Sequence, residues 1–207
     1  PQTLPWGIDR VEADLAWSTT SGAGIKVAIV DTGIDLRHPD LSSNIKGGVN
    51  TIYPRKSAND DNGHGTHVAG TVAALNNSIG VVGVGHAVSL YAVKVLNSNG
   101  SGFLSDVIEG LDWSVNNGMQ VVNMSLGTNS DIQSFHDAVV KVNQAGIMQV
   151  AAAGNDGGAV DFPGAYPEVI GVAAVQKNAG GTLSVASFTS RGREVDISAP
   201  GVDILST

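Results

Sequence analysis

The sequence has 207 residues, which suits one globular domain, and its 42% hydrophobic content excludes a disordered chain. Its 19 acidic residues outnumber 11 basic ones and give a formal net charge of −8, which argues against a nucleic-acid-binding surface. Cysteine is absent, so disulfides, thiolate zinc sites and cysteine nucleophiles are excluded. No apolar run approaches the roughly 20 residues that a membrane-spanning helix needs.

Short apolar, β-branched runs alternate with amphipathic segments along the chain. The runs expected to form buried strands are 25–30, 89–96, 120–124, 147–152 and 169–175. Apolar residues spaced three and four apart predict helices over 103–115 and 132–142, and small apolar residues predict a third over 67–74. This alternation predicts one α/β domain with a mostly parallel central sheet and helices on both faces. Ligands of such sheets bind beyond the carboxyl ends of the strands.

Two candidate catalytic residues lie in glycine-containing segments. Asp31 follows the first strand, where its carboxylate could orient a partner or serve as an ordinary turn residue. His64 is flanked by glycines and is expected to be exposed at the start of a helix, where an imidazole with a pKa of about 6.5 can act as a general base. His67 would permit a zinc site, but the metalloprotease signature places its histidines four apart with a glutamate between them. His67 is therefore expected to pack or hydrogen-bond within the helix.

A third candidate segment, 151–157, follows the strand expected at 147–152. Its small residues would let a ligand approach the backbone, and the Asn155 amide could donate to an oxygen that becomes negatively charged during a reaction. Taken alone, this segment is also typical of an ordinary loop.

In this order, Asp31-Thr32-Gly33, segment 64–70 and segment 152–155 together resemble the subtilisin-like serine proteases, and the similarity extends over essentially the whole chain. The resemblance implies a three-layer subtilisin-like α/β fold and a secreted, calcium-stabilised serine endopeptidase of broad specificity. It also implies that Asp31 accepts a hydrogen bond from His64, that His64 moves the proton of a serine hydroxyl, and that Asn155 binds the oxyanion.

The resemblance further implies which residues hold the substrate. Two extended segments would clamp a peptide between them as an added β-strand, and they comprise Gly100, Ser101 and Gly102, and Ser125, Leu126 and Gly127. Ala152, Ala153 and Gly154 would line the main specificity pocket, with Asp161 at its floor. Asp161 either favours Lys or Arg before the scissile bond or is a solvated loop carboxylate.

Calcium is the cofactor that the resemblance implies. The matching residues could surround one cation with carbonyl, amide and carboxylate oxygens, and they are Gln2, Asp40, Leu75, Asn77, Ile79 and Val81. Without the resemblance, the Asn-Asn-Ser stretch within 75–81 is typical of an ordinary turn.

The pattern stops before the family's nucleophile, which lies in a Gly-Thr-Ser-Met-Ala-x-Pro-His segment opening a long central helix. Residues 1–207 are therefore interpreted as the N-terminal and central part of one catalytic domain. The serine is expected on a separate C-terminal fragment, held noncovalently because the chain has no cysteine. The absence of that helix would expose a large apolar area on one face of the sheet. The start at Pro1 suggests that any signal or pro-segment has been removed.

Three functions remain open on the sequence. The first is the serine endopeptidase, completed by its C-terminal fragment. The second is an inactive fragment that binds peptide and calcium, and the third is a structural calcium-binding protein. Expected partners are protein or peptide substrates, the C-terminal fragment, and a pro-segment or protein inhibitor, with neither nucleic acid nor membrane among them.

Overall fold

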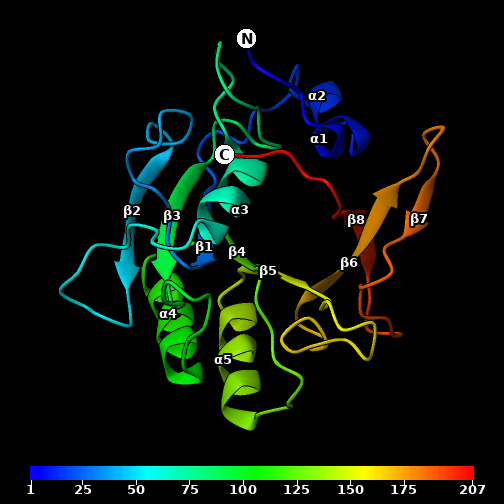
Figure 1. Ribbon diagram of the computed structural model, residues 1–207. Helices are drawn as coiled ribbons and strands as arrows, with labels where there is room; N and C mark the ends of the chain where they lie inside the picture. Colours follow the sequence, from blue (N-terminus) through cyan, green and yellow to red (C-terminus); the bar gives the residue numbers. More distant parts are fainter.

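The computed structural model describes residues 1–207, and its centre is an eight-stranded sheet (Figure 1). The strands are β1 (Lys26–Asp31), β2 (Ile45–Asn50), β3 (Ser89–Lys94), β4 (Val121–Met124), β5 (Met148–Ala152), β6 (Ile170–Lys177), β7 (Leu183–Val185) and β8 (Ile197–Pro200). Their order is β2-β3-β1-β4-β5-β6-β7, with β8 also paired to β6. Every pairing is parallel except that of β6 with β7.

Helices cover both faces of this sheet. They are α1 (Trp6–Arg10), α2 (Ala13–Ala16), α3 (His64–Ala73), α4 (Leu104–Asn116) and α5 (Gln133–Gln144). Helix α3 lies on one face, and α4 and α5 lie side by side on the other (Figure 1). The three-layer, mostly parallel α/β fold expected from the sequence is confirmed.

Alternate residues of β1 divide the core between the two faces. Val27 and Ile29 pack in the cluster that includes Ala69 and Ala73 of α3. Ala28 and Val30 pack in the cluster formed with α4 and α5. Because side chains alternate along a strand, Asp31 continues the row of Val27 and Ile29 and projects toward α3. A central strand that is apolar on both faces thus ends in one carboxylate.

The five strands and three helices expected from the sequence are all present, with ends shifted by at most three residues. Helix α3 begins at His64 rather than at residue 67. The sequence analysis missed β2, β7, β8 and the short helices α1 and α2, none of which carries a long apolar period. None of the helices has the length and hydropathy needed to cross a membrane.

The last residues of the chain lie against α3. From β8 the chain runs back over the sheet to this helix (Figure 1). The Ser206 hydroxyl donates to the His67 carbonyl at 2.7 Å, and the Thr207 hydroxyl donates to the Thr66 carbonyl at 2.8 Å. A side chain at Gly70 would collide with both of these hydroxyl groups, so this close approach depends on glycine.

Candidate active site

Asp31 is a buried carboxylate at the carboxyl end of the central strand β1. It is fully shielded from solvent. Its Oδ1 lies 2.7 Å from His64 Nδ1 and accepts the Thr32 backbone N–H at 2.7 Å. Its backbone carbonyl accepts N–H groups from Val95 and Leu96, which follow β3. The neighbouring strand therefore fixes the position from which the carboxylate reaches His64.

His64 is the first residue of α3, as the glycines around it predicted. Gly63 has a φ of 105°, a left-handed conformation that glycine adopts at little cost. A Cβ at Gly65 would collide with the Gly33 carbonyl oxygen, so only glycine lets the helix start approach the turn after β1 this closely. The His64 side chain remains 49% exposed while its partner Asp31 is buried. The imidazole therefore has one ring nitrogen against Asp31 and a face open to solvent.

The turn before α3 is held by a second carboxylate, Asp60. Its Oδ2 accepts the Thr66 hydroxyl at 2.6 Å, and its Oδ1 accepts the Thr32 hydroxyl at 2.8 Å and the N–H groups of Asn62 and Gly63. Burial by itself would raise the pKa of Asp60, but these hydrogen bonds outweigh it and lower the pKa. Asp60 is therefore an ionised carboxylate whose hydrogen bonds hold the turn after β1 against the start of α3.

The environment of His64 favours its protonated form. The hydrogen bond to Asp31 raises the pKa of His64, burial works against this rise, and the charges of Asp31 and Asp60 add to it. A raised pKa means that imidazolium is stabilised whenever it forms. This is the property required of a residue that takes up a proton during a reaction and later returns it.

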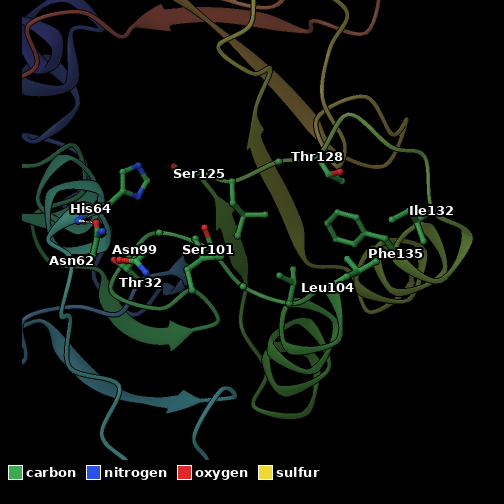
Figure 2. A pocket seen from close by; sticks show the side chains of 16 residues that line it. Thr32, Asn62, His64, Asn99, Ser101, Leu104, Ser125, Thr128, Ile132 and Phe135 are labelled. Atoms are coloured by element: carbon green, nitrogen blue, oxygen red, sulfur yellow. Dashed lines mark hydrogen bonds between the residues drawn. The ribbon is translucent and has the colours of Figure 1, made fainter.

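Two hollows meet at His64 and Ser125. The first has a volume of about 650 Å³ and runs from His64 to an apolar end at Leu104, Ile132 and Phe135 (Figure 2). All six residues predicted to clamp a peptide line it, namely Gly100, Ser101, Gly102, Ser125, Leu126 and Gly127. The structure therefore brings the two predicted segments together beside the histidine.

The second hollow has a volume of about 610 Å³ and lies on the face of the sheet that α3 covers only in part. Twelve of its 22 lining residues are hydrophobic, and they come from α3, β5, β6, β8 and the loops that carry Ala153, Phe188 and Ile204. Asn155 and the predicted pocket residues Ala152, Ala153 and Gly154 line it together with His64. Asn155 is exposed, so its amide is accessible from this hollow.

Asp161 lies against Gly127, which lines the first hollow, and against Gly154, which lines the second. An added Cβ at Gly127 would come within 3.1 Å of the Asp161 Cβ, and one at Gly154 would collide with the Asp161 carboxylate. Asp161 forms no ion pair, and the Ser190 Oγ beside Gly154 is buried without a hydrogen-bond partner. Burial raises the pKa of Asp161, and the nearby Asp156 raises it further.

The six residues predicted to bind calcium also lie together. Gln2 Nε2 has four oxygen acceptors within 3.4 Å, which are the carbonyls of Leu75, Ile79 and Val81 and the Asn77 Oδ1. Asp40 joins the same cluster, since its Oδ1 accepts from the Asn77 amide at 2.7 Å. A side-chain amide has only two hydrogens, so four acceptors exceed what it can satisfy.

The sequence offered two roles for His67, a zinc ligand or a packing and hydrogen-bonding residue. No group of three or more His, Cys, Asp and Glu side chains is arranged to hold a metal ion. His67 does form a hydrogen bond, but its partner lies outside the helix, since Nε2 is 3.0 Å from the Ile204 carbonyl oxygen.

The sequence analysis missed two charged residues near His64, Asp60 and Lys94. Asp60 lies in a polar stretch, Asn59-Asp60-Asp61-Asn62, in which no single carboxylate stands out. Lys94 did carry a signal, because it is one cation within the apolar run 89–96 and therefore requires buried partners.

Comparison with known proteins agrees with this geometry. The profile of the subtilase family matches residues 22–207. Over 208 aligned positions the whole chain is 50% identical to a thermostable alkaline protease of Halalkalibacterium halodurans, of which it covers 56%. It is 48% identical to Subtilisin Savinase of Lederbergia lenta, covering 75%, and to an alkaline protease of Shouchella clausii, covering 53%. The chain thus spans about half to three quarters of the length of these relatives.

Asp31→Asn tests whether the charge of Asp31 raises the pKa of His64. An amide carries no charge to stabilise imidazolium, so the substitution should lower the pKa of His64, measured from the ring C–H shifts in an NMR titration. The exposed Glu109 on α4 provides a control, since Glu109→Gln should leave this pKa unchanged. An unchanged His64 pKa in Asp31→Asn would contradict the assignment of Asp31 as the group that raises it.

Proposed function

Because the chain belongs to the subtilase family, we propose that it forms most of the catalytic domain of a serine endopeptidase that hydrolyses peptide bonds in proteins. The observation that carries the proposal is the 2.7 Å contact between buried Asp31 and half-exposed His64, at the point where two hollows meet. A structural calcium-binding protein would have no use for this pair.

Asp31 and His64 supply the acid–base half of the reaction. With Nδ1–H donated to Asp31, the His64 Nε2 is left as the basic nitrogen. In the proposed mechanism Nε2 takes the proton of a serine hydroxyl as that hydroxyl attacks the scissile carbonyl, and it then gives the proton to the leaving amine. Asp31 holds the tautomer and stabilises the imidazolium. The Asn155 amide donates to the oxyanion of the tetrahedral intermediate.

The serine nucleophile is proposed to lie outside residues 1–207, in a segment that occupies the second hollow. A helix opening with this serine would cover the apolar lining and place the hydroxyl between His64 and Asn155, which share the hollow. The serines of this chain near the site have other partners. Ser125 Oγ accepts from the Asn123 amide, and Ser206 Oγ donates to the His67 carbonyl.

The first hollow is proposed to bind the peptide on the amino side of the scissile bond. Segments 100–102 and 125–127 would pair their backbones with it as an added strand, which makes few demands on its sequence. The apolar end at Leu104, Ile132 and Phe135 would accept a bulky apolar side chain.

The activity can be tested on the complete protein, with the serine segment present. A fluorophosphonate should label its nucleophilic serine, and His64→Ala should abolish both this labelling and hydrolysis of an unfolded protein substrate. Asn155→Ala should lower kcat by about 100- to 1000-fold, the known cost of removing the oxyanion-binding amide of a subtilisin.

The thermal unfolding temperature of each variant is measured as a control that the variant is folded. Absence of labelling in the folded complete protein would contradict the proposal and favour the alternative, a fragment that binds peptide and calcium without catalysis. Secretion, which the resemblance implies, stays a prediction.

Calcium is the second part of the proposal. The cluster around Gln2 offers three backbone carbonyls, the Asn77 amide oxygen and the Asp40 carboxylate, a donor set of oxygens that suits Ca²⁺. The four acceptors that converge on one amide nitrogen would be satisfied better by a cation. The residues therefore fit the ion, which would link the N-terminal segment to loop 75–81.

Asp40→Asn tests the calcium site without measuring activity. Wild-type protein should unfold at a higher temperature in millimolar calcium than in a chelator, since a ligand that binds only the folded state stabilises it. The substitution removes the one carboxylate of the cluster and should abolish most of this difference. The remote Glu109→Gln should retain it. Equal calcium stabilisation of wild type and Asp40→Asn would contradict the site.

Asp161 is proposed to select a cationic side chain before the scissile bond. Its carboxylate has no ion-pair partner and lies beside Gly154 and the unpartnered Ser190 Oγ. A Lys or Arg side chain of the substrate could engage both groups beside Gly154, which has no side chain of its own.

The selectivity is measured as kcat/KM on matched peptides with Lys, Arg, Phe or Leu before the scissile bond. Asp161→Ser should lower kcat/KM for the Lys and Arg peptides at least tenfold and leave the Phe and Leu values within about twofold. Asp156→Asn is the control for general charge. Equal losses for all four peptides would show that Asp161 shapes the loop rather than selecting charge.

A further inference from the structure

Lys94 is the only basic residue of the chain that is buried, and the proposed mechanism does not use it. Its side chain is 4% exposed. It ends β3 in register with Asp31 at the end of β1. The alternate residues Leu90 and Ala92 pack in the same cluster as Val27 and Ile29, so Lys94 and Asp31 project from the same face of the sheet, toward α3.

The Lys94 ammonium has three partners, which matches its three hydrogens. It donates to the Thr32 carbonyl at 2.6 Å, the Leu96 carbonyl at 2.9 Å and the Asp61 Oδ1 at 2.6 Å. Thr32 directly follows Asp31, Asp61 lies three residues before His64, and Leu96 lines the first hollow. One buried cation therefore joins the segments that carry the carboxylate, the histidine and the proposed peptide site.

The charge of Lys94 is compensated unevenly. Two of its three partners are neutral carbonyls, and the third, Asp61, is 54% exposed and therefore screened by solvent. The charges that raise the pKa of His64 are those of Asp31 and Asp60. Lys94 therefore acts on this histidine through the segments that it joins.

We propose that Lys94 is a positioning residue for the Asp31–His64 pair. Its three hydrogen bonds hold the turn after β1, the loop before α3 and the chain after β3 together, so that the Asp31 carboxylate and the His64 ring meet at 2.7 Å. The inference gives a role in the proposed peptidase, but its first test does not require peptidase activity.

The test is the pKa of His64, followed by NMR in the folded complete protein carrying one of two substitutions. Lys94→Met removes the three hydrogen bonds and should lower this pKa, because His64 then loses part of its contact with Asp31. Lys94→Arg can still donate to the same acceptors and is the matched control, with a smaller shift than Lys94→Met. Asp61→Ala removes the one side-chain acceptor of Lys94 and should also lower the pKa. If Lys94→Met does not fold, Asp61→Ala still gives a result, because an unchanged pKa in that variant would contradict the positioning role.

A role of Lys94 in core stability alone predicts a different outcome. It would lower the unfolding temperature and leave the pKa of His64 unchanged in the folded protein, which would overturn the proposal, as would a raised pKa in Lys94→Met. In the active enzyme, the acid limb of kcat against pH should move to lower pH in Lys94→Met. A lowered pKa of His64 in a Lys94→Met protein whose wild type cleaves no peptide would support this inference while contradicting the proposed function.

Discussion

The site depends on keeping a carboxylate out of water at the end of a central strand. Removing a charged group from water is costly unless nearby dipoles and charges replace the hydration. At Asp31 the replacement comes from the Thr32 N–H and the His64 ring, both at Oδ1, while Oδ2 is buried without a partner. Because both contacts are made by Oδ1, the hydrogen bond with His64 offsets a large part of the cost of burying this carboxylate.

This arrangement needs parallel strands of matched length. β1 lies between β3 and β4, and its last residue pairs with the last residue of β3, so side chains that end two strands meet at one edge of the sheet. Gly65 then lets α3 start against the turn after β1. A bulkier residue there would move His64 away from Asp31. The register of β1 with β3 and the glycine at position 65 therefore both determine the distance between Asp31 and His64.

Much of this could be predicted from the sequence, and the exceptions have physical reasons. The strands and helices of the core were visible because their apolar periods are set by burial. Asp31 was visible because it follows the first apolar run and precedes Gly33, and His64 because glycines flank it. β2 was missed because Lys46, Gly47 and Gly48 offer no apolar run, and the strand is instead held by its pairing with β3. The hydrogen bonds of Asp60 and Lys94 to Thr32, and of Lys94 to Asp61, join residues 28 to 62 positions apart, and no local pattern encodes such distances.

The contact of Gln2 with loop 75–81 has a topological consequence. Together with the Thr3 N–H that donates to the Gly80 carbonyl at 2.8 Å, it closes the first eighty residues into a ring in a chain that has no cysteine. Closing a loop of this length costs conformational entropy when the chain folds. Unlike a covalent crosslink, this closure is absent from the unfolded chain, and it can open and reform. β1 and α3 both lie within the ring. The first few residues thus close the loop within which Asp31 and His64 both lie.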